Sequence, residues 1–220
     1  MSLTLYWGSG SPVSWRAQLC LAFKGLAYES RRLDLGAKEH KSEWYLALNP
    51  RGTFPLLVDG EVKVRGSLAI LSYLERKHPE PPLFGTTAEE CGRIWECIDD
   101  HEDGLGDTVQ LLCRAIFRPK GDRSPEYLQP LLDKAETQLA ALEKALVGPY
   151  LLGDTVTAAD LVHYPTLHRY LRAAVHERGE MVARQLERIR GDSPTLFAWL
   201  ERVQTMPGVE DTYPPHWRSS

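Results

Sequence analysis

The first 80 residues alternate short apolar runs with helical patterns. The apolar run at residues 3–7 predicts a β-strand. After it, Trp15, Leu19, Ala22 and Phe23 recur at the spacing of one helix face, which predicts an amphipathic helix. A strand that leads directly into a helix indicates that sheet and helix pack as layers in this part of the chain.

Within these first 80 residues, the part after residue 27 adds a strand, a hairpin and another helical pattern. Residues 28–35 are polar for a strand, which favours the edge of a sheet. Apolar runs at residues 55–58 and 62–64 flank an Asp59-Gly60 pair, a strong hairpin signal. We therefore expect a small mixed sheet covered by helices.

A proline-rich stretch at residues 79–85 separates this part from an all-helical remainder. We expect two domains, residues 1–79 and residues 87–220. Within the second, Gly104 and Gly106 interrupt a long helical pattern and indicate a kink. The chain contains no internal repeat and no low-complexity tract.

Composition and charge exclude several functions. With 220 residues and a net charge of −4, the chain has no electrostatic basis for binding nucleic acid or an anionic membrane. No apolar run approaches the ~20 residues of a membrane span, and the first residues show no secretory signal. The four cysteines lack zinc-site spacing, so we expect no metal. Free thiols fit a cytoplasmic location. These cysteines are Cys20, Cys91, Cys97 and Cys113.

Residues 9–16, Ser-Gly-Ser-Pro-Val-Ser-Trp-Arg, follow the first strand and open the first helix. Ser11 is a favoured N-cap, and Pro12 then occupies the first helical position. Free N–H groups and the helix dipole attract anions to such a place, and a thiolate is one candidate. The alternative is that Ser11 is a helix cap without chemistry.

Four motifs in this order resemble the glutathione transferase superfamily. Residues 9–16 resemble the serine-type active site of its phi, theta and zeta classes, and residues 49–56 resemble its loop that ends in a cis-proline. Residues 66–70 resemble its Glu-Ser-x-Ala-Ile motif, and residues 153–160, with a capping box, resemble its helical-domain signature. The resemblance covers the whole chain. It implies an α/β, thioredoxin-like N-terminal domain with a mixed four-stranded sheet, joined to an all-α C-terminal domain.

The resemblance also assigns residues to a site. Ser11 is the catalytic residue that it implies, and glutathione is the co-substrate. In the family, the backbone before the cis-proline pairs with the cysteinyl part of glutathione, and the helix that starts at Ser67 holds the γ-glutamyl carboxylate. Gly66 replaces the usual glutamate and removes a carboxylate. The implied glutathione-binding residues are Ser9, Ser14, His40, Lys41, Thr53, Phe54, Pro55, Gly66 and Ser67.

The chemistry requires a modest stabilisation of the thiolate. Lowering a thiol pKa from ~8.5 by ~2 units takes about 2.7 kcal/mol. One hydroxyl hydrogen bond to a charged acceptor supplies ~1.5–3 kcal/mol, and a helix N-terminus adds ~0.3–1 kcal/mol. We expect the electrophile between the two domains, as small-ligand sites often lie there. Its expected walls are Tyr6, Trp7, Trp95 and His101.

Three functions are compatible with these residues. The first is a detoxifying cytoplasmic transferase that attacks a small electrophile with the glutathione thiolate, and the resemblance implies a homodimer. The second is a zeta-like glutathione-dependent isomerase, indicated by Ser14-Trp15-Arg16. The third is a non-catalytic glutathione-binding or interaction protein, which the loss of a carboxylate at Gly66 favours.

Overall fold

The computed structural model describes residues 3–218. Among these residues two compact units are found: one holds residues 3–83 and 206–218, and the other holds residues 84–205. The division lies inside the proline-rich stretch. That stretch also holds a cis peptide bond at Glu80–Pro81, which we did not predict. The return of the last residues to the first unit was not predicted either.

The first unit contains a mixed four-stranded sheet, as expected. Its order is β2-β1-β3-β4. The central strand β1 (Leu3–Trp7) runs parallel to β2 (Tyr28–Arg32) and antiparallel to β3 (Leu56–Asp59). The predicted hairpin joins β3 to β4 (Val62–Arg65). Polar β2 lies at the edge, where its exposed side chains meet water.

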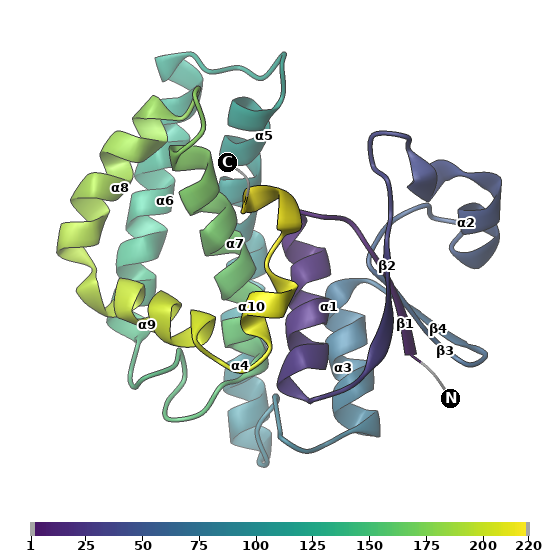
Figure 1. The fold of residues 1–220 in the computed structure, drawn as a ribbon. Helices are drawn as coiled ribbons and strands as arrows, with labels where there is room; N and C mark the ends of the chain where they lie inside the picture. Colours follow the sequence, from purple (N-terminus) through teal and green to yellow (C-terminus); the bar gives the residue numbers. More distant parts are fainter. Residues whose placement is uncertain (1–2, 219–220) are drawn as a thin grey trace. The chain divides into compact units, whose positions relative to one another are not determined.

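Helices cover both faces of this sheet (Figure 1). Helices α1 (Pro12–Phe23) and α3 (Ser67–Lys77) pack together on one face. Helix α2 (Glu43–Leu48), preceded by the short η1 (Glu39–Lys41), lies on the other. Every residue of α1 from 14 to 21 is buried, so this helix is more enclosed than its single predicted apolar face indicated.

The returning segment explains part of this burial. It forms α10 (Val209–Thr212) and η3 (Pro215–Trp217), and α10 packs on α1. The indole N–H of Trp15 donates to Thr212 Oγ1 at 2.7 Å. The Trp15 ring also meets the ring of Trp217 edge to face, with centroids 5.8 Å apart. The segment is therefore anchored on the helix that follows the Ser11 turn.

The second unit consists of helices. Its long first helix is interrupted by a π-helical segment at the two predicted glycines, which confirms an irregularity there. A Cβ on Gly106 would lie 2.8 Å from the carbonyl oxygen of His101, so this segment requires glycine. The elements are α4 (Ala88–Asp100), η2 (His101–Gly106), α5 (Asp107–Phe117), α6 (Pro125–Ala145), α7 (Ala158–Ala174), α8 (Glu180–Asp192) and α9 (Pro194–Gln204).

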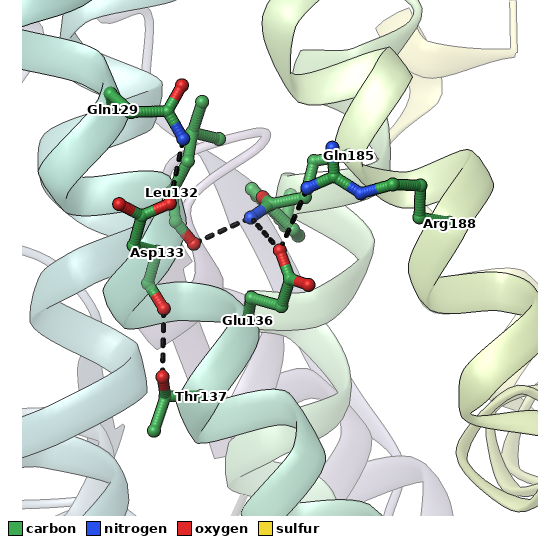
Figure 2. A network of polar contacts seen from close by, with 8 residues as sticks. Gln129, Leu132, Asp133, Glu136, Thr137, Gln185 and Arg188 are labelled. Carbon is green, nitrogen blue, oxygen red and sulfur yellow. Dashed lines mark hydrogen bonds and ion pairs between the residues drawn. The ribbon is translucent and has the colours of Figure 1, made fainter.

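Buried polar groups fix the helices of this unit. Asp160, fully buried in the predicted capping box of α7, accepts hydrogen bonds from the Thr157 N–H at 2.8 Å and the Trp199 indole at 2.8 Å. Figure 2 shows a second network between α6 and α8. There Gln185 donates to the carbonyl of Leu132 at 2.6 Å and to Glu136 at 3.2 Å. Because these partners come from different helices, each network fixes a relative helix position.

No helix within residues 3–218 combines the length and the apolar character that crossing a bilayer demands.

Candidate active site

A tight turn, Gly8 to Ser11, carries the predicted catalytic serine. The N–H of Ser11 donates to the carbonyl of Gly8 at 3.3 Å, and Gly10 has a φ of 75°. A positive φ at the third residue is the mark of a type II turn, where glycine is favoured. The N–H of Gly8 donates in turn to Ser14 Oγ at 3.1 Å. The turn is thus held by the first residues of α1.

Ser14 serves this turn and does not face a ligand. Its side chain is completely buried, and its oxygen accepts the Gly8 hydrogen bond. The resemblance assigned Ser14 to glutathione binding as a member of the serine-type motif at residues 9–16. The structure corrects that assignment, since a fully buried hydroxyl cannot reach a bound molecule.

Ser11 occupies the N-cap position of α1, but its side chain makes no capping hydrogen bond. Only its backbone carbonyl serves the helix, by accepting from the Trp15 N–H at 3.0 Å. The side chain is partly exposed. The interpretation of Ser11 as a mere cap therefore loses its basis, because a capping serine uses its oxygen for the helix.

Ser9 has a partner from the far end of the chain. Its Oγ lies 2.8 Å from Nδ1 of His216, which belongs to η3. Sequence reasoning missed His216 because 207 positions separate the two residues. No local pattern marks the histidine as part of a site.

The cis-proline loop is built around a buried amide. The Phe54–Pro55 bond is cis, as predicted. The carbonyl of Thr53 accepts from Asn49 Nδ2 at 2.6 Å and from the Tyr45 hydroxyl at 2.7 Å. Asn49 is fully buried. Sequence reasoning took Asn49 only as part of a turn and missed this role, although an asparagine before a proline was the available signal.

The third motif lies beside the second. Gly66 precedes α3 with a φ of 84° and a ψ of 140°, and a Cβ there would meet no atom within 4 Å. Ser67, the first residue of α3, is 6% exposed. The N–H groups of this helix start are suited to holding a carboxylate.

His40 and Lys41 come from η1, next to the cis-proline loop. The His40 ring meets the Phe54 ring edge to face at 5.6 Å. Among residues 3–218, the buried Nδ1 of His40 has no hydrogen-bond partner. Lys41 is exposed and places Nζ 3.3 Å from the carbonyl of Arg51.

Two of the expected electrophile walls, Tyr6 and Trp7, lie on opposite faces of the sheet. Tyr6 and Trp7 are adjacent in β1, so their side chains point to opposite faces of the sheet. Tyr6 packs against Trp44 and Tyr45 near α2. Trp7 is 7% exposed and donates its indole N–H to Ser30 at 2.9 Å. Because strand side chains alternate between the two faces, Tyr6 and Trp7 cannot both line the same side of this sheet.

The other two expected walls lie in the helical unit. Trp95 stacks on Phe84 with ring centroids 5.2 Å apart. His101 is 1% exposed, with Nε2 3.0 Å from Thr166 Oγ1. Together with Cys97 and other residues it lines a pocket of about 550 Å³ formed by residues of α4, η2, α6 and α7. His101 is therefore part of that pocket's wall.

Three of the chain's own thiols, two buried and one half-buried, are poor nucleophiles. Burial raises the pKa of Cys20 and of Cys113 to about 12, and that of Cys97 to about 11. These three groups are protonated at neutral pH, and the nucleophile is the thiolate form. Among residues 3–218, no group of three or more histidine, cysteine or acidic side chains is placed to hold a metal ion.

Comparisons with known proteins agree with this fold. The first unit's sheet and helices form a thioredoxin-like domain, and a helical domain follows it. Residues 5–82 match the family model "Glutathione S-transferase, N-terminal domain", and residues 125–202 match "Glutathione S-transferase, C-terminal domain". The chain belongs to the glutathione S-transferase family.

Similar proteins come from plants and a clam. Glutathione S-transferase F9 of Arabidopsis thaliana is 35% identical over 162 residues, covering 68% of this chain and 73% of that protein. A zeta-class glutathione S-transferase of Euphorbia esula is 33% identical, covering 76% and 75%. The crystal structure of a glutathione S-transferase from the Antarctic clam Laternula elliptica superposes with a TM-score of 0.86. It is 29% identical and covers 100% of this chain and 95% of that one.

Proposed function

We propose that this protein is a glutathione transferase in which the Ser11 hydroxyl stabilises the thiolate of bound glutathione. One observation carries the assignment of the serine: Ser11 occupies the N-cap position of α1, yet its side chain makes no capping bond. Its hydroxyl is therefore available to donate to an anion at a helix N-terminus. One such hydrogen bond, at ~1.5–3 kcal/mol, is enough to lower a thiol pKa by one to two units.

We assign the other parts of the glutathione molecule to groups near the turn. The backbone of Phe54 pairs with the cysteinyl part, and the start of α3 at Ser67 holds the γ-glutamyl carboxylate. His40 and Lys41 face the glycyl carboxylate. The buried Nδ1 of His40, which has no hydrogen-bond partner among residues 3–218, supports a polar contact that glutathione completes.

We assign the electrophile to a cavity beside Ser9. This cavity has a volume of about 350 Å³ and belongs entirely to the first unit. Its lining mixes charged and apolar groups, which suits a small molecule with a polar substituent. The lining residues are Ser9, Arg32, Leu33, Asp34, Leu35 and His216. Tyr6 and Trp7 are not among them, so in this proposal the residues of this cavity take the place of Tyr6 and Trp7 as walls of the electrophile site.

The experiment that tests the function combines binding with turnover. Calorimetry with glutathione measures binding, and a conjugation assay with a chloronitrobenzene measures transfer. We expect binding, thiolate absorbance in the ultraviolet and steady conjugation. If glutathione binds but the protein neither conjugates it nor isomerises a cis-enone, the protein is a non-catalytic glutathione-binding protein. If glutathione does not bind, the proposal is wrong.

We further propose a cytoplasmic homodimer. Family resemblance supports the dimer, and the four free cysteines support a reducing compartment. Light scattering on the purified protein tests the dimer, and fractionation of the source cells tests the compartment.

A further inference from the structure

The position of His216 is fixed by its neighbours in the returning C-terminal segment. Trp217, next in sequence, is only 9% exposed and packs on Trp15. On the other side of His216, Thr212 is tied to Trp15 by the 2.7 Å hydrogen bond. The histidine therefore sits between two anchors on α1, the helix that Ser11 starts.

His216 lies directly on the active-site turn. Its Nδ1 is 2.8 Å from Ser9 Oγ. A Cβ on Gly10 would lie 2.9 Å from Cε1 and 3.1 Å from Nε2 of the ring. The imidazole thus covers the residue between Ser9 and Ser11, and glycine is needed there both for this close approach and for the positive φ.

A site that ionises a thiol needs a place for the proton. Ser11, as proposed, donates a hydrogen bond to the thiolate and keeps its own proton. Histidine is the side chain whose ordinary pKa falls between pH 5 and 8, so it accepts protons near neutral pH. His216 is exposed and can return a proton to solvent.

We propose that His216 accepts the glutathione proton through Ser9 and so acts as a positioning and proton-accepting residue of this site. This inference rests on the proposed function. The thiol S–H bond breaks and its electron pair stays on sulfur. The proton passes to the Ser9 oxygen while the Ser9 hydroxyl proton passes to Nδ1 of His216. The resulting imidazolium then releases a proton to solvent, which restores the neutral ring.

The charged groups around the ring have both signs. Arg32, from β2, and Asp34, from the loop that follows, line the same cavity as His216. Within the C-terminal segment, Glu210 and Arg218 form an ion pair at 3.1 Å. The cavity therefore presents one cationic and one anionic side chain together with the His216 ring.

The test compares two His216 substitutions across pH. His216→Asn retains an oxygen near the position of Nδ1, which can bond Ser9 but cannot take a proton at neutral pH. His216→Gln also lacks the ring, and its longer side chain places the amide beyond the position of Nδ1. We expect both variants to lose about tenfold or more in kcat/KM near neutral pH and to lose the acidic limb of the pH profile. Added imidazole should restore part of the activity.

The controls separate the two proposals. His176→Asn changes a histidine of the helical unit and should leave the pH profile unchanged. Ser9→Ala should lower kcat/KM as much as His216→Asn, and the double variant should lose no more, because both residues serve one proton path. Thermal unfolding checks that each variant is folded.

A wild-type pH profile in His216→Asn would show that the histidine only supports the turn, and the inference would fall. That outcome leaves the proposed function intact, provided that the wild type forms the thiolate and Ser11→Ala does not. If the wild type forms no thiolate with glutathione, the proposed function itself fails.

Discussion

The backbone N–H of Gly66 donates a 3.2 Å hydrogen bond to the carbonyl of Pro55. This bond joins the residue before α3 to the cis-proline loop, two segments that we assign to the neighbouring γ-glutamyl and cysteinyl parts of glutathione. We therefore expect a substitution at either residue to alter the position of both segments.

Gly66→Glu tests the missing carboxylate. A Cβ has open space there, but a φ of 84° strains any residue other than glycine, at about 1–3 kcal/mol. The added carboxylate faces the ammonium of the γ-glutamyl group. Such a pair is worth between ~0.2–1 kcal/mol when exposed and ~2–5 kcal/mol when buried. We expect lower stability by thermal unfolding and tighter glutathione binding by calorimetry.

Gly66→Gln is the matched control, because it carries the same strain without the charge. If the two variants bind glutathione equally, the ammonium is already satisfied by another group. Weaker binding by Gly66→Glu than by Gly66→Gln would mean that the ligand carries no ammonium at this point.

Ser11→Ala should separate catalysis from folding. The side chain makes no capping bond, so we expect the free energy of unfolding to change by less than about 0.5 kcal/mol. A capping serine would cost about 1 kcal/mol. Turnover should fall more than tenfold, and the pH at which bound glutathione ionises should rise. Ser11→Thr, which keeps a hydroxyl, should retain more of the thiolate absorbance. Unchanged thiolate absorbance in Ser11→Ala would mean that a group other than Ser11 stabilises the thiolate.

Asn49→Ala should loosen the cis-proline loop. It removes the 2.6 Å hydrogen bond to the Thr53 carbonyl and leaves only that from Tyr45. We expect a loss of about 1–3 kcal/mol in stability. Glutathione binding should weaken as well, because Phe54 follows Thr53. Tyr45→Phe removes the other donor to the same carbonyl and serves as the comparison. Full glutathione affinity in both variants would show that this carbonyl does not position the ligand.

His168 should make the protein sensitive to acid. Burial lowers the pKa of His168 to about 4 from an ordinary value of 6.5. The unfolded chain binds this proton first, so stability is full above pH 6.5 and declines as the pH falls toward 4. We expect His168→Phe to remove part of this decline, on the order of 1–3 kcal/mol. Denaturant unfolding at several pH values measures it, and parallel curves for both proteins would contradict the assignment.

Some features of this protein were determined by the sequence alone. The start of α1 after Ser11, the hairpin at Asp59-Gly60, the capping box at Thr157 and the irregular helix at Gly104 all depend on local chemistry. Turns, caps and glycine interruptions involve residues within a few positions of one another. Their spacing is therefore visible in the chain before it folds.

The placement of Tyr6 and Trp7 on opposite faces was also available from the sequence, because strand side chains alternate. We expected both residues among the walls of the electrophile site because they end the first strand. A strand directs such neighbours to opposite faces of the sheet, so at most one of the two faces any given ligand.

Only the tertiary structure decided which serine is available and what surrounds it. Ser14 is taken by the Gly8 N–H, Ser11 is left without a capping role, and Ser9 meets His216. Nothing local brings His216 to this turn. Its approach depends on Trp15 and Trp217 packing together, a contact across about 200 positions whose free energy comes from burying two large side chains.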